Sequence, residues 1–342
     1  EPRRGTFSLD LRIEARAALA ERGYRPGPHP VTIALTVANF LAWLALAHTA
    51  SRWHGLPWLL ASVVCGFLLL GMGAAGHGFV HQGSRLSFVF DMVDASTRTW
   101  RIDHCLLHHM FTNDHTDDPD VTVLGPAIDF SGGGRVQRRL AWLYCHLLYL
   151  LGAWLIRVVN LFRLFRAPAG LAGLHAARIV MPAFGAVIFY ALTAWWRWLF
   201  FLVTGAPLGT CILSELVYSL ATLSCSFVSH NQPACDYAGS FADRVAAAGG
   251  DWDLAQLREC WDFGPRSFWA ATYLGGHLGN QTVHHLFPAV DPWHHRSLIE
   301  VLERVCARHQ IAYRRHSWLS LWRGHMKSMM RPVDRRMWSN PR

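Results

Sequence analysis

Histidine accounts for 20 of the 342 residues, and many of these histidines lie in short clusters whose spacing suits metal binding. His77 and His81 are four residues apart, and so are His104 and His108. Residues at this spacing share one face of a helix, one turn apart, so each pair can hold one metal ion. The next residue, His109, points about 100° away from His108, which suits a second metal ion or a bridging position.

Two later groups extend this ligand set. His230 follows a long apolar stretch, and Gln281, His284 and His285 lie together, with residues 281 and 285 again four apart. About one adjacent histidine pair is expected by chance at this composition, so the prediction of a metal centre depends on the clusters together. Eight histidines and one glutamine are enough for two metal ions. The imidazole-rich set leaves iron, zinc, copper or manganese open.

The cysteines and the charge exclude other classes. None of the eight cysteines belongs to a C-x-x-C pair, which disfavours iron–sulfur clusters and cysteine-type zinc sites. The net charge is +9, but an excess of arginine on one side of a membrane explains it, so we predict no nucleic-acid partner. Apolar residues make up 52% of the chain and charged residues 16%, against roughly 25% charged in soluble domains, which argues against a water-soluble enzyme.

Apolar segments must bring the clusters together. A membrane span needs about 20 mostly apolar residues. We predict four such spans, at about 31–50, 56–76, 179–203 and 207–229, paired into two helical hairpins. The segment at about 140–156 is followed by several arginines, and we predict that it is an amphipathic helix in the membrane interface. Arg197, among tryptophans, is expected in an interfacial aromatic belt.

Four spans place the chain before the first span, residues 77–178 and residues 230–342 on one side of the membrane. That side carries nearly all the arginines, so the positive-inside rule makes it cytoplasmic. We therefore expect an all-α, multi-pass protein of the bacterial inner membrane, with two hairpins under a cytoplasmic helical cap that holds two metals. Its predicted parts are a cytoplasmic segment (1–30), the main domain (31–310) and a basic tail (311–342).

At the histidine clusters the sequence resembles the membrane fatty acid desaturase superfamily, a group of integral-membrane di-iron enzymes with three histidine boxes. The family patterns are H-x-x-x-H, H-x-x-x-H-H and Q-x-x-H-H, and the chain has HGFVH, HCLLHH and QTVHH. The flanking stretch WRIDHCLLHHMFTNDHTDDPDV is also similar to the family's second box. The glutamine in the third box resembles the branch that contains front-end acyl-lipid desaturases.

The resemblance implies a particular set of iron ligands. By position in the boxes these are His77, His81, His104, His108, His109, His284 and His285, with His230 as an additional ligand. Gln281 stands where other branches have histidine, and His277, one turn earlier, is an alternative to it. Metal-bound imidazoles usually donate their other N–H to a carboxylate or carbonyl. Asn113, Asp118 and Asp120 are the expected partners of that kind.

The implied function is O2-dependent desaturation of an acyl chain by two non-haem irons. The substrate would be an acyl lipid, an acyl-CoA or an acyl carrier protein. The chain has no His-Pro-Gly-Gly haem signature, so the electrons are expected from a separate carrier of the ferredoxin or cytochrome b5 type. A di-iron hydroxylase or oxygenase acting on a lipid, alkane or carotenoid is the main alternative. A membrane zinc hydrolase and a non-enzymatic metal-storage protein are the others.

Overall fold

The computed structural model describes residues 6–93, 95–114, 116–122, 135–164, 190–205, 207–234 and 240–330. These residues form helices and loops, with one isolated β-bridge between Asp262 and Arg315, and the predicted all-α class is confirmed. The α-helices are α1 (Phe7–Glu21), α2 (Pro30–Ala50), α3 (Gly55–His81), α4 (Phe88–Asp91), α5 (Thr97–Ile102), α6 (Arg135–Leu164), α9 (Trp196–Thr204), α10 (Leu208–His230), α11 (Phe241–Ala247), α12 (Trp252–Glu259), α13 (Phe268–Gly275), α14 (Gln281–Leu286), α15 (His295–His309) and α16 (Trp318–Met329).

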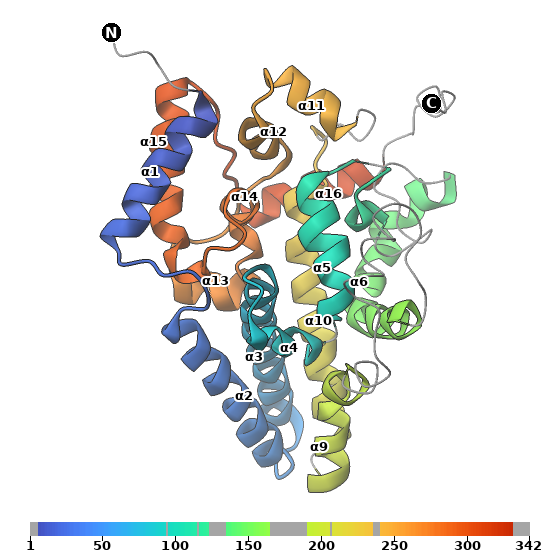
Figure 1. Ribbon diagram of the computed structural model, residues 1–342. Helices are drawn as coiled ribbons and strands as arrows, with labels where there is room; N and C mark the ends of the chain where they lie inside the picture. Colours follow the sequence, from blue (N-terminus) through green and yellow to red (C-terminus); the bar gives the residue numbers. More distant parts are fainter. Residues whose placement is uncertain are drawn as a thin grey trace.

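Four helices are long and apolar enough to cross a membrane: α2, α3, α10 and the part of α6 from Arg139 to Asn160. In Figure 1, α2, α3 and α10 form the lower part of the molecule, and α1, α11, α12, α14 and α15 gather above them. The outward faces of the long helices are apolar, with Leu41, Leu60 and Leu143 more than half exposed. Exposed apolar faces of this kind suit a hydrocarbon environment.

Helices α2, α3 and α10 agree with the first, second and fourth predicted spans. The third predicted span, 179–203, lies mostly outside the described residues. Its described end is not one continuous helix, because Trp195 leaves helical geometry just before α9 begins. The arrangement in two hairpins therefore stays a prediction.

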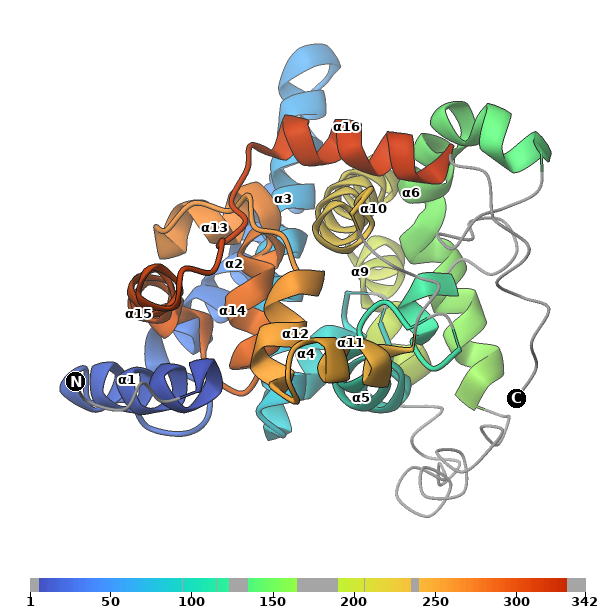
Figure 2. The same cartoon turned by 90° about the horizontal axis from the view of Figure 1, so that it is seen from above.

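Helix α6 is longer than the interfacial helix predicted at 140–156. It extends over 30 residues, and by length and composition alone it is a fourth candidate span. Figure 2 looks along the axis of α10, whereas most of α6 runs lengthwise across the same view. The two helices cross steeply and are joined at Ser219, whose hydroxyl accepts from Ala153 N at 2.8 Å and donates to Tyr149 O at 2.6 Å.

Arg197 is not at an exposed membrane interface, so that prediction was wrong. Its side chain is fully buried, and its Nε lies 2.7 Å from Oε1 of Glu215 on α10. The same carboxylate oxygen lies 3.2 Å from Nη2 of Arg157 on α6. We call Arg157, Glu215 and Arg197 the buried ion cluster. Its carboxylate compensates the cost of burying the guanidinium groups, which the tryptophan-rich sequence around Arg197 did not reveal.

The N-terminal helix α1 is packed against α15, near the other end of the chain (Figure 1). Phe7, Leu11, Ala15 and Leu19 recur every four residues and form one buried apolar stripe. The stripe belongs to a hydrophobic core that includes Leu302 and other residues of α15. Arg12 adds polar contacts by donating to Leu286 O and pairing with Asp253.

Candidate metal centre

The last turn of α3 supplies the first two histidines of the candidate site. His77 and His81 lie on one face of this turn, and their Nε2 atoms are 3.0 Å apart. Gly76 allows α4 to approach this turn closely, because a Cβ there would lie 2.7 Å from the backbone nitrogen of Phe90. Phe90 in turn stacks on the His77 ring, with 5.9 Å between ring centroids. The glycine thus helps to fix the position of the first ligand.

The second box lies in a short π-helix from Asp103 to His108 that continues α5. π-helical turns are rare and often occur at functional sites. The rings of His104 and His108 stack at 4.8 Å between centroids, with 21° between their planes, and His109 is turned away from both. All three histidines are buried. This arrangement agrees with the prediction that His109 has a separate direction.

The remaining candidate ligands come from α10 and α14. His230 is the last residue of α10, and its Nε2 lies 3.2 Å from Nε2 of His285. His284 and His285 point in different directions, with 89° between their rings. His284 meets the His109 Nε2 at 3.1 Å, while the His109 ring stacks on His285 at 4.2 Å. The structure therefore brings residues from all four predicted clusters to one place.

The histidine ring nitrogens form two groups, and the nitrogens of each group lie close enough together to hold one metal ion. His77, His81, His104 and His284 make the first, and His108, His230 and His285 make the second. Within these groups the short Nε2–Nε2 separations are 2.9 Å from His77 to His104, 3.0 Å from His77 to His81, and 3.2 Å from His230 to His285. Metal–nitrogen bonds of about 2.0–2.1 Å place neighbouring ligand atoms about 2.8–3.4 Å apart, so the residues fit a metal ion in each group. His109 lies between the groups.

Two carboxylates contact the ring nitrogens of His104 and His108 that face away from the candidate metal positions. Asp120 Oδ2 lies 2.8 Å from Nδ1 of His104, and Asp118 Oδ2 lies 2.8 Å from Nδ1 of His108. An imidazole that donates its Nδ1–H in this way turns an unprotonated Nε2 toward the metal. Asn113, with a φ of 61°, donates its backbone N–H to the same Asp118 oxygen at 2.7 Å. Asp118 and Asp120 therefore lie beside imidazole nitrogens, whereas Asn113 contacts no imidazole among the described residues and holds Asp118 instead.

Gln256 is a supporting residue that the sequence reasoning missed. Its side chain is fully buried, and its Nε2 donates to His109 O at 2.7 Å. That contact fixes the amide so that Oε1 faces Nδ1 of His285 at 3.1 Å. The sequence offered no signal for this role, because only the fold brings Gln256 to His285.

Burial sets the protonation of most of these histidines. Desolvation lowers the pKa of His104, His109, His284 and His285 well below its usual value, so their rings are neutral and ready to bind a metal. His108 differs. Desolvation also acts to lower its pKa, but the charges of Asp118 and Asp120 outweigh this effect and raise the pKa to about 9. The same negative charge favours a bound metal cation there.

Gln281 and His277 occupy different environments. The Gln281 amide nitrogen is placed 2.8 Å from Nε2 of His230 and 3.3 Å from Nε2 of His285. Its Oε1 is buried and has no partner among the described residues. Turning the amide by 180° would place that oxygen toward the second group as a ligand. His277 instead bonds Thr272 Oγ1 at 2.8 Å and belongs to neither group, so it does not replace Gln281.

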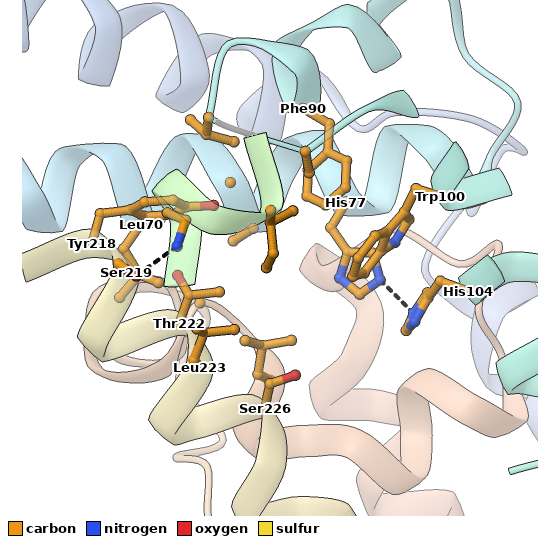
Figure 3. A pocket seen from close by; sticks show the side chains of 18 residues that line it. Leu70, His77, Phe90, Trp100, His104, Tyr218, Ser219, Thr222, Leu223 and Ser226 are labelled. Carbon is orange, nitrogen blue, oxygen red and sulfur yellow. Dashed lines mark hydrogen bonds between the residues drawn. The ribbon is translucent and has the colours of Figure 1, made fainter. Parts of the chain in front are cut away.

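A mainly apolar cavity adjoins the first group (Figure 3). His77, Trp100 and His104 lie on one side of it, and Leu70, Tyr218 and Ser219 lie on the opposite side. Trp100 also stacks on His104, with 4.6 Å between ring centroids. The remaining lining is mainly apolar and comes from α3, α4 and the loop after it, α6, α10 and the segment after α13. A hydrocarbon chain in this cavity would lie against the candidate metal ligands.

Replacing Asp118 with asparagine is expected to weaken metal binding by about 10–100-fold, because His108 loses the charge that orients and polarises its ring. Metal titration of the purified protein, with detection of bound metal, measures this effect. Asp117→Asn is the matched control, since Asp117 is exposed and one residue away. Equal affinities in the two variants would contradict a supporting role for Asp118.

These features define a class of protein: an all-helical chain with membrane-length apolar helices and a buried polyhistidine centre beside an apolar cavity. The sequence model of the fatty acid desaturase family matches residues 53–317, a range that contains all the candidate ligands. The chain therefore belongs to the fatty acid desaturase family, and the predicted family resemblance is confirmed.

Three relatives of the chain are named as lipid desaturases. The chain is 25% identical over 336 residues to the sn-1 linoleoyl-lipid 6-desaturase of Arthrospira platensis, covering 91% of the chain and 88% of that relative. It is 26% identical over 291 residues to the acyl-lipid (8-3)-desaturase of Physcomitrium patens, covering 77% of the chain and 59% of the relative. It is 25% identical over 234 residues to the acyl-lipid (8-3)-desaturase of Mortierella alpina, covering 64% and 50%.

Proposed function

We propose that this protein is an O2-dependent acyl-lipid desaturase whose centre holds two irons. The observation that carries the proposal is the apolar cavity that ends beside His77 and His104. The proposed ligands are His77, His81, His104, His108, His109, His230, Gln281, His284 and His285. Asn113, Asp118 and Asp120 support them. Membership of the fatty acid desaturase family, together with the names of the relatives, favours desaturation over hydrolysis or metal storage.

The metal pair, when bound, would supply the oxidation that removes one hydrogen from each of two adjacent carbons, and these two hydrogens, with O2, two electrons and two protons, would end as two water molecules. The protein's own part is positioning. The cavity holds an alkyl chain against the ligands and keeps water away from it. Trp100 stacks on His104 and would separate an alkyl chain in the cavity from the side of the centre that contains Asp118 and Asp120. The carboxylates accept from the Nδ1–H groups of His104 and His108, so that the Nε2 atoms of these rings would face the metals.

We also propose the substrate and electron source. The relatives named as lipid desaturases favour an acyl chain esterified in a membrane lipid over acyl-CoA or an acyl carrier protein. The electrons would come from a separate carrier protein of the ferredoxin or cytochrome b5 type. The arginine-rich segments support a cytoplasmic position for the histidine boxes in a bacterial inner membrane, because positive charge is retained on that side.

Mass spectrometry of lipids from a host that expresses the chain with a suitable electron carrier tests this proposal. A lipid about two mass units lighter than a host lipid, absent with His108→Ala, is the expected result, because two hydrogens leave the chain. A species about sixteen units heavier, without an olefin, would make the protein a hydroxylase. One zinc and no iron in the purified protein would instead indicate a hydrolase.

A further inference from the structure

The turn that follows His230 is held in place by a helix from the other end of the chain. Helix α10 ends at His230, and Asn231 leaves helical geometry with φ −91° and ψ 80°. The end of a helix has backbone groups without partners in the helix, so its position depends on contacts from elsewhere. Here α16 supplies contacts of this kind, because it packs across this end of α10 (Figure 1 and Figure 2).

His325 of α16 makes the central contact. Its side chain is fully buried, with Nδ1 3.0 Å from Nδ2 of Asn231 and Nε2 2.7 Å from the hydroxyl of Tyr149 on α6. Desolvation lowers the pKa of His325 to about 3, so the ring is neutral. A neutral imidazole accepts a hydrogen bond at one nitrogen and donates one at the other. The ring therefore satisfies both neighbours and joins α6 and α16 to the end of α10.

Gln232 connects the same turn to α16 a second time. Its Nε2 donates to Val228 O of α10 at 2.6 Å and to Leu321 O of α16 at 2.9 Å. Its backbone N–H donates to His230 O at 3.2 Å. Gly324 allows α16 to come this close, because a Cβ there would lie 3.1 Å from the amide carbon of Gln232. The first two residues after His230 are thus both bonded to α16.

These contacts act on the backbone that carries a candidate metal ligand. The Nε2 atom of His230 lies 3.2 Å from that of His285 in the second group of histidines. Metal ligands must be held to within about 0.5 Å of their working positions. Because Asn231 and Gln232 follow His230 directly, a shift of this turn would move the His230 ring relative to His285.

We propose that His325 is a positioning residue of the second metal group: through Asn231 it fixes the end of α10, and hence the place of the His230 ring. His325 belongs to neither group of candidate ligands itself. The inference rests on the proposed function, because it assigns His230 to the metals of that reaction. It makes α16, which contains none of the histidine boxes, a part of the metal site.

Two replacements of His325 separate this role from ordinary packing. Asparagine and leucine have nearly the same shape, but only asparagine keeps a hydrogen-bonding group where Nδ1 of the histidine faces Asn231. Both variants lose the contact with Tyr149. Titration of the metal-free, full-length chain in detergent with Co2+, followed by visible absorption, gives the metal affinities. We expect His325→Leu to weaken Co2+ binding at one of the two groups by about tenfold, and His325→Asn to keep the parental affinities.

The same two variants in a His230→Ala background show whether the effect passes through His230. They should bind Co2+ equally there, because two changes that act through one ligand are not additive. Asn231→Ala removes the contact from the other side and should match His325→Leu, so the test does not depend on the folding of a single variant. Arg323→Gln is the control, since Arg323 is an exposed residue of α16 and its replacement should leave the affinities unchanged.

Equal affinities in His325→Asn and His325→Leu would overturn the inference, as would a difference between them that persists without His230. Parental affinity in Asn231→Ala would also contradict it. A parent chain that binds no Co2+ would overturn both this inference and the metal centre of the proposed function. Failure of desaturation alone would appear as missing olefin, while the Co2+ affinities could still be measured.

Discussion

Replacing His109 with alanine is expected to abolish desaturation, with a loss of more than about 100-fold, because changes behind a metal ligand alone commonly cost 10–100-fold. His109 has a central place in the site. Its Nε2 lies 3.1 Å from that of His284 and 3.3 Å from that of His104, and its ring stacks on His285. Its removal takes away a nitrogen donor that lies between the two groups and the ring that packs on His285 of the second group.

The measurement is metal content per chain together with the yield of olefin. We expect His109→Ala to hold less than one metal ion per chain, and His108→Ala to keep the ion of the first group. The control is His48→Ala, since His48 is an exposed residue near the end of α2. Full metal content and unchanged product in His109→Ala would remove this residue from the proposed ligand set.

Replacing Glu215 with glutamine is expected to destabilise the folded protein by about 3–5 kcal/mol, because it leaves two buried guanidinium groups without their carboxylate. Glutamine keeps nearly the same shape, so the effect reports the charge and not lost packing. Arg157 and Arg197 belong to α6 and α9, so the variant weakens the contact of both helices with α10. Thermal or denaturant unfolding in detergent measures the change.

Glu303→Gln is the matched control for this variant. Glu303 pairs with Arg266 at 2.6 Å, but Arg266 is half exposed. Exposed pairs of this kind contribute at most about 1 kcal/mol. If the two variants lose equal stability, the buried ion cluster does not hold the helices together.

Most of the candidate site was predictable because metal ligands can be recognised in a sequence from their residue type and spacing. His77 with His81, and His104 with His108, are recognisable as pairs because one turn of helix separates them. That the clusters come together from distant segments could be inferred, because His77 and His81 end α3 and His230 ends α10. Gln256 escaped notice because one glutamine in a short helix carries no periodic signal, and only the fold brings it to His285.

The fold was predictable where a segment is apolar throughout. Spans α2, α3 and α10 are such segments, whereas α6 mixes apolar residues with arginine, and its length was underestimated. Arg197 illustrates the limit best. Composition places an arginine among tryptophans at a membrane surface, but pairing with Glu215 decides the outcome, and such a pairing between helices cannot be derived from either segment alone.

The packing of α1 on α15 imposes an order on the making of this protein. Arg12 bonds the carbonyl of Leu286, 274 residues further along the chain. At a synthesis rate of about 5–20 residues per second, α1 therefore waits roughly 15–55 s for its partner to leave the ribosome. Throughout that interval its apolar stripe is without its native cover. The bilayer is the nearest apolar phase, so the nascent amino-terminal helix is expected to lie at its surface until α15 has been translated.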